Sequence, residues 1–131
     1  YPERLEKQVD FLDVHKEVSC VETYIDVYDG DSVTGIRRVE LEPTLDTLTK
    51  GGYPFHHPTI MIRKSVLQEL NGYDNSNTYK RCEDLELWYR FFVAGFKGYN
   101  LDIPLTRYNE NSLDYKKRKT SSMKNAVNLR K

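Results

Sequence analysis

The sequence is poor in the residues that fix a small protein's structure or chemistry by themselves. It has two cysteines, Cys20 and Cys82, and neither stands at the close Cys or His spacing of a zinc site. We therefore expect free thiols in a reducing compartment. Lys and Arg number 20, as do Asp and Glu, so the net charge is zero. This balance argues against nucleic-acid binding by bulk positive charge. Apolar runs are far shorter than the ~20 residues of a membrane span.

Several signatures of catalysis are absent as well. The sequence contains no Gly-rich phosphate loop and no legible Ser/His/Asp or Cys/His nucleophile arrangement. It has no initiator Met and no signal peptide, and its opening Tyr1-Pro2-Glu3 is like the first turn of a helix. We expect that the chain is a piece of a longer protein.

Enough apolar surface is nevertheless present for the chain to fold. Hydrophobic residues make up 38% and aromatic residues 12%, including ten Tyr, which excludes a disordered chain. One domain is the simplest expectation for 131 residues. At the N-terminus, Leu5, Val9 and Leu12 recur at i, i+4 and i+7. Residues 2–14 are therefore predicted as an amphipathic helix that buries these three side chains.

Further helices are predicted from capping and stop signals. A short helix is expected at 44–50. Residues 65–68 read as a capping box at the start of another short helix, which Gly72 ends. A later helix, ended by Gly95, is expected to place four apolar side chains on one face: Leu85, Trp88, Tyr89 and Phe92.

Strands alternate with these helices. Residues 18–28 are rich in β-branched and aromatic residues, and Asp29-Gly30 is a turn signal that predicts a hairpin with 33–37. We interpret Asp29-Gly30-Asp31 as this turn rather than as a metal-binding Asp-x-Asp. A buried strand is expected at 59–62, and two short strands are expected around Pro104, at 99–101 and 105–108. The alternation predicts an α/β fold with helices packed on a mixed sheet.

Charge is distributed unevenly along the chain. Residues 115–131 contain seven Lys and Arg and no Asp or Glu, whereas residues 1–114 carry all the acidic residues. One interpretation of 115–131 is a solvated basic helix or tail beyond the core. The other is peripheral contact with an anionic membrane or an acidic surface, to which each basic residue contributes about 1 kcal/mol.

The most informative stretch for chemistry is Cys82-Glu83-Asp84. Two carboxylates at a helix N-terminus are favoured in the ionised form by the helix dipole, and an ionised carboxylate can accept a proton. Adjacent helical residues diverge by about 100°, so Glu83 and Asp84 cannot share one task. The alternative is ordinary charging of a helix N-terminus.

A second candidate is the pair His56 and His57, which lies between two prolines in a stiff loop. Adjacent histidines can supply a phosphate contact, a proton carrier or a metal ligand, although they lack the i, i+4 spacing of a helical zinc pair. A packed or solvent-facing pair is the alternative. Trp88 could stack on a sugar ring, but its helical spacing favours a place in the core.

The order of four motifs resembles the C-terminal half of bacterial family-2 glycosyltransferases, which have the GT-A fold. Residues 1–8 are similar to the helix that follows that family's metal-binding Asp-x-Asp. His57-Pro58-Thr59 and the residues after it resemble its His-Pro-Ser/Thr strand. Residues 70–74 resemble its Gly-Gly-Tyr-Asp turn, with Asn71 in place of the first Gly. Cys82-Glu83-Asp84 resembles its x-Glu-Asp motif. The resemblance covers about residues 1–115.

The resemblance implies an inverting transfer of a sugar from a nucleotide-sugar donor, a UDP-sugar first of all, to a glycan or lipid-linked acceptor in cell-surface polysaccharide biosynthesis. Asp84 would be the catalytic base. Glu83, His56, His57 and Trp88 would bind substrate. Mg²⁺ or Mn²⁺ would assist the complete enzyme through ligands that precede Tyr1, and the work would be done in the cytoplasm or at the inner face of the membrane.

The resemblance also divides the chain. Residues 1–114 would form the acceptor-side half of a GT-A-like, Rossmann-type domain, and 115–131 the basic tail. We expect these residues alone to be inactive and to self-associate through an unpaired sheet edge or apolar face. The alternative is a non-catalytic module derived from the same fold that binds a glycan or a partner.

Overall fold

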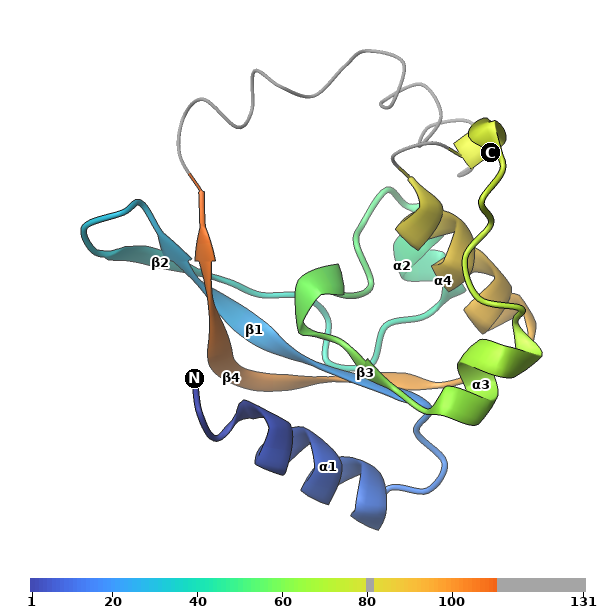
Figure 1. Cartoon of the computed structure of the whole chain (residues 1–131), viewed down its shortest axis with the longest axis horizontal. Coiled ribbons are helices and arrows are strands. Elements are labelled where there is room, and N and C mark those ends of the chain that lie inside the picture. Colours follow the sequence, from blue (N-terminus) through green and yellow to red (C-terminus); the bar gives the residue numbers. More distant parts are fainter. Residues whose placement is uncertain (80–81, 111–131) are drawn as a thin grey trace.

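The computed structural model describes residues 1–79 and 82–110, and Figure 1 shows their arrangement. The basic segment 115–131 and the predicted boundary at residue 114 lie outside the described residues. In the part that is described, no helix has the length and apolar character needed to cross a bilayer. The elements, in chain order, are α1 (Arg4–Val14), β1 (Cys20–Tyr28), β2 (Val33–Arg37), α2 (Leu45–Thr49), η1 (His57–Thr59), β3 (Met61–Ile62), α3 (Lys64–Glu69), η2 (Asn77–Tyr79), α4 (Glu83–Val93) and β4 (Gly98–Asn109).

The predicted α/β class with a mixed sheet is confirmed. β1 lies at the centre of the sheet, with β4 parallel to it along one edge. On the other edge, β3 pairs antiparallel with the start of β1 and β2 pairs antiparallel with its end. Along β1, the pairing with β3 reaches Val21 and the pairing with β2 covers Ile25 onward, so 22–24 have no strand partner on that edge in the described chain. Residues next to the candidate site fill this gap, as described below.

Helices cover the two faces of the sheet unequally. α1 lies against one face, and α3 and α4 lie on the other (Figure 1). Successive side chains of β1 point to opposite faces of the sheet, so neighbouring residues contact different helices. Val21 packs in a cluster with Leu12 of α1. Cys20 instead belongs to the larger cluster that holds Phe55 and the α4 residues Leu87, Trp88 and Phe91.

The larger core depends on a close approach between Phe55 and β4. A Cβ atom added at Gly98 would lie 2.2 Å from Cζ of Phe55 and 2.6 Å from its Cε1. Real Cβ atoms do not come this near to another side chain, so the glycine leaves the space that the ring occupies. Both predicted free cysteines are buried and unbridged.

The predicted buried face of α1 is wrong. Leu12 is buried, but Leu5 and Val9 are 58% and 45% exposed. Gln8 is fully buried in their place, and its Nε2 donates to the carbonyl oxygens of Val21 (3.1 Å) and Thr59 (2.7 Å). A polar residue turns inward because the gap beside β1 leaves backbone acceptors that need donors.

The capping box predicted at 65–68 is also wrong. The N-cap of α3 is Arg63, two residues before Ser65, so Ser65 lies inside the first turn. The Arg63 guanidinium fixes this boundary, because it donates to the carbonyl oxygens of Val18 (2.9 Å) and Leu12 (2.6 Å). A capping box does occur before α2, between Thr44 and Thr47.

Three further expectations need correction. The predicted strand 59–62 is a 3₁₀ turn at η1 followed by the two-residue β3. The two short strands expected around Pro104 are one strand, β4, because the register against β1 shifts beside Pro104 and the resulting bulge accommodates a residue without an N–H. On α4, Tyr89 is 41% exposed, and the fully buried face includes Phe91.

The predicted turn at Asp29-Gly30 is confirmed. Asp29 Oδ1 accepts hydrogen bonds from the backbone N–H groups of Asp31 and Ser32, both at 2.9 Å. Gly30 has φ +113, a conformation that glycine adopts without strain. β1 and β2 therefore form the expected hairpin.

Candidate active site

The two predicted carboxylates lie at the N-terminus of α4. Glu83 is its first residue and is exposed, and Asp84 follows it in a half-buried position. Asp84 Oδ1 accepts the backbone N–H of Leu85 at 2.9 Å. The first turn of α4 thus presents one carboxylate to solvent and holds the next one partly sheltered.

His57 faces the same region from η1. Its Nε2 lies 2.9 Å from the hydroxyl of Tyr73, and the two rings meet edge to face with centroids 5.7 Å apart. Burial lowers the pKa of His57, while the charges of Asp84 and Glu83 oppose that shift. Burial and the Asp84 charge raise the pKa of Tyr73. The charges of the α4 carboxylates therefore influence the protonation of both His57 and Tyr73.

Tyr73 was not singled out as a site residue from the sequence. The available signal was its place in the 70–74 motif, which predicted a turn and no chemistry. The turn is held against α4 by Arg90, whose guanidinium donates to the carbonyl oxygens of Leu70 and Gly72. Arg90 is itself held by Glu86 through two bonds of 2.6 Å. This clamp holds the turn against α4, and Tyr73, the next residue, lies close enough to Asp84 and Glu83 for their charges to help raise its pKa.

His56 turns toward the interior. Its Nδ1 and its backbone N–H lie 3.1 and 2.9 Å from Oε2 of Glu22, a β1 residue with no exposed surface. The ring is 12% exposed. Nothing in the sequence marked Glu22, because its partners are more than 30 positions away along the chain. The two adjacent histidines thus have different surroundings.

Trp88 is a core residue with 1% exposure. Its ring meets His57 at a centroid distance of 5.6 Å and Phe55 at 4.5 Å. It therefore supports His57 from beneath and has no open face for a sugar ring in the described structure.

The described part of the chain has no cluster of side chains that could bind a metal ion. Within residues 1–79 and 82–110, no three His, Cys, Asp or Glu side chains gather in a group that would hold one. The residues described do not fit a metal site by themselves, and we derive no chemical step through a metal.

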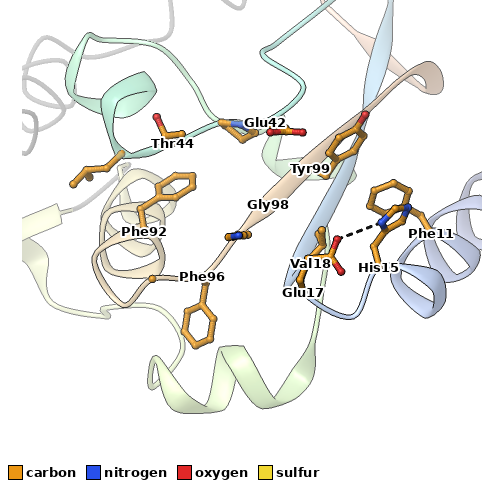
Figure 2. A pocket seen from close by; sticks show the side chains of 14 residues that line it. Phe11, His15, Glu17, Val18, Glu42, Thr44, Phe92, Phe96, Gly98 and Tyr99 are labelled. Atoms are coloured by element: carbon orange, nitrogen blue, oxygen red, sulfur yellow. Dashed lines mark hydrogen bonds and ion pairs between the residues drawn. The ribbon is translucent and has the colours of Figure 1, made fainter.

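A separate hollow of about 630 Å³ opens beside the start of β4 (Figure 2). Phe11, His15 and Tyr99 stack along one side of it, with centroid distances of 4.2 and 4.8 Å, and Phe92 and Phe96 lie across from them. None of the predicted site residues belongs to the described residues that line it. It is therefore a separate cavity from the candidate site discussed above.

The chain is similar in sequence to bacterial glycosyltransferases. No family model matches the chain. The chain is 42% identical over 128 residues to a Bacillus subtilis protein named "Putative glycosyltransferase EpsE", which covers 97% of the chain. It is 25% identical over 130 residues, 98% of the chain, to the amylovoran biosynthesis glycosyltransferase AmsE of Erwinia amylovora.

The chain is homologous to bacterial glycosyltransferases. A third relative is the UDP-Gal:alpha-D-GlcNAc-diphosphoundecaprenol beta-1,3-galactosyltransferase of Escherichia coli, at 26% identity over 75% of the chain. The chain spans 46%, 35% and 48% of the length of EpsE, the galactosyltransferase and AmsE. AmsE is named for amylovoran biosynthesis, and in each of the three relatives the match covers less than half of the protein.

Proposed function

We propose that the chain is the acceptor-side half of an inverting glycosyltransferase of family-2 type with a GT-A fold. Its donor would be a nucleotide sugar, with a UDP-sugar as the first candidate. Its acceptor would be a glycan or a lipid-linked molecule. The observation that carries the proposal is the half-buried Asp84 at the N-terminus of α4, beside His57 and Tyr73. The galactosyltransferase activity for which the Escherichia coli relative is named supports the choice of substrates.

In the proposed reaction, Asp84 is the catalytic base. Its carboxylate removes the proton from an acceptor hydroxyl while that oxygen bonds to the anomeric carbon of the donor. The bond from that carbon to the diphosphate oxygen breaks at the same time, and the diphosphate leaves with the electron pair. A general base must accept a proton in the transition state, which a positioned carboxylate can do.

The neighbouring residues would bind and orient the acceptor. His57 Nε2 and the Tyr73 hydroxyl share a hydrogen bond near the charge of Asp84, and this pair would bind sugar hydroxyls or the diphosphate through the Tyr73 hydroxyl. Glu83 would orient the acceptor from the exposed side. His56 and Trp88 would contribute by holding His57 in place. Mg²⁺ or Mn²⁺ is proposed for the intact protein, with its main ligands outside the residues described.

Asp84→Asn in the intact protein tests this function. Because the amide cannot accept the proton, we expect sugar transfer to fall by about 10²–10⁴-fold, mainly in kcat. Transfer of a radiolabelled sugar from UDP-sugars to a lipid-linked acceptor measures it. Asp10→Asn, an exposed acid on α1, is the matched control and should transfer at the wild-type rate. Unchanged activity in Asp84→Asn would refute the assignment and favour a non-catalytic glycan- or partner-binding module.

A further inference from the structure

Glu22 is a buried carboxylate whose hydrogen-bond donors all come from one turn. It has no exposed surface. Its Oε2 accepts the backbone N–H of His56 at 2.9 Å and the hydroxyl of Thr59 at 2.9 Å, and it lies 3.1 Å from Nδ1 of His56. Its Oε1 has no hydrogen-bond partner among the described residues. A carboxylate this deep is costly unless it is well bonded, so these contacts define what Glu22 does.

The turn that Glu22 holds occupies the gap in the sheet. Thr59 is fully buried, and its Oγ1 lies 3.2 Å from the carbonyl oxygen of Thr23, opposite the stretch of β1 that neither β2 nor β3 reaches. The side chain of Gln8 also grips the turn, since it donates to the Thr59 carbonyl oxygen and to that of Val21. Residues 56–59 are therefore fixed by polar side chains instead of by a backbone ladder.

Fixing His56 and Thr59 also fixes His57, which lies between them. His57 opens the 3₁₀ turn η1, which is closed by the Thr59 N–H donating to the His56 carbonyl oxygen at 2.9 Å, and Pro58 follows His57 with a fixed φ. Because the residues on both sides are anchored, the backbone of His57 has little conformational freedom. Its ring then meets Trp88 below and the Tyr73 hydroxyl beside it.

We propose that Glu22 is a positioning residue of the candidate active site: its carboxylate anchors the 56–59 turn and thereby holds the His57 ring against Tyr73, facing Asp84. This inference rests on the proposed function for its catalytic meaning. Glu22 does not contact substrate, because it is fully buried beneath the turn. A residue that only stabilises the fold would leave His57 unchanged as long as the protein stays folded. A positioning residue should change His57 in variants that remain folded.

The variants separate the anchor from its surroundings. Glu22→Leu removes the acceptor, Glu22→Gln keeps one oxygen and the shape, and Thr59→Val removes the hydroxyl donor on the other side of the contact. Thr23→Val is the control, because Thr23 is equally buried on β1 and its Oγ1 has no partner among the described residues. Each variant is made in the intact protein, and its folding is checked by thermal melting.

Two readouts are compared, the titration of His57 and the rate of sugar transfer. The titration is followed by NMR of the imidazole ring and assigned with His57→Gln. Burial lowers the pKa of His57 in the wild type, so release of the turn should raise it toward its ordinary value. A displacement of about 1 Å can cost 10²-fold in rate, so we expect losses of up to about that size in kcat, larger for Glu22→Leu than for Glu22→Gln.

The outcomes decide the inference. A raised His57 pKa with reduced kcat in Glu22→Gln or Thr59→Val, and neither change in Thr23→Val, supports it. Wild-type titration and rate in both Glu22→Gln and Thr59→Val overturn it, whether or not Glu22→Leu folds. If the wild-type protein transfers no sugar, the proposed function fails, and the His57 titration still decides whether Glu22 positions the turn.

Discussion

The two edges of β1 are built in different ways. Along one edge, β4 pairs with β1 from Cys20 to Tyr28, with two register shifts. Along the other edge, backbone pairing covers only the two ends, and the side chains of Gln8, Glu22 and Thr59 occupy the interval. One edge is a continuous ladder, and the other is a ladder interrupted by buried polar side chains.

The difference shows what an interruption in a sheet makes possible. Backbone groups that lack a strand partner still need hydrogen bonds when buried, so polar side chains are drawn into the interior. Those side chains can hold an irregular turn, and a turn can carry a side chain such as His57 to a place that a regular strand would not reach. The candidate site lies on the interrupted side for this reason.

Gly98→Ala tests the continuous edge and should have the largest effect on stability. The new Cβ would lie 2.2 Å from the Phe55 ring, which is 2% exposed and has little room to move. We expect the free energy of unfolding to fall by about 3 kcal/mol, the upper end for overpacking. Urea denaturation measures this. Gly35→Ala in β2 is the matched control, because nothing lies within 4 Å of its Cβ position. Equal stability of the two variants would contradict the close packing.

Gln8→Met tests the interrupted edge and should have a somewhat smaller effect. Methionine keeps the length of the side chain but removes the donor to the buried carbonyl oxygen of Val21. Thr59 retains a second donor, because Arg4 Nη1 lies 3.3 Å from its carbonyl oxygen. We expect a loss of about 2 kcal/mol, the cost of a buried acceptor left without a partner. Leu5→Gln is the control, and a larger loss there than in Gln8→Met would restore the originally predicted face of α1.

The pH dependence of stability should give the smallest effect, through His57. Burial lowers its pKa from the ordinary value of 6.5, against the opposing charges of Asp84 and Glu83. Between the lowered pKa and 6.5, the unfolded chain binds more protons than the folded one, so the free energy of unfolding rises with pH in that window. It should fall as the pH drops below 6.5. Chemical denaturation at a series of pH values should show a shallower slope for His57→Gln, and an unchanged slope would contradict the burial of the imidazole.

Local patterns in the sequence predicted most elements. Residues 18–28 and 33–37 with the Asp29 turn, and the end of α4 at Gly95, required only periodicity and turn chemistry. The errors came from tertiary contacts. Gln8 is helical by any local rule, but only the gap beside β1 explains why it faces inward in place of Leu5 and Val9.

The candidate site was predicted in part for the same reason. Asp84 and His57 stood in recognisable motifs, and the structure brings the charge of one to bear on the other. Glu22 lies in a stretch rich in residues that favour β-strands. A single acidic residue in such a stretch indicates a side chain that faces solvent. Its burial follows from donors supplied more than 30 residues later, and no local pattern carries that information. Tyr73 was hidden in a turn motif that indicates shape alone.

The parallel pairing of β1 with β4 has a consequence for the order of folding. It joins Cys20 to Gly98, so every segment that supplies the candidate site lies within the loop that this pairing closes. Closing a long loop has a high entropic cost, and parallel strands pair slowly. During synthesis the strand Gly98–Asn109 emerges after all of the candidate residues. The His57 turn and the Asp84 helix can therefore reach their final arrangement only when β4 has paired with β1.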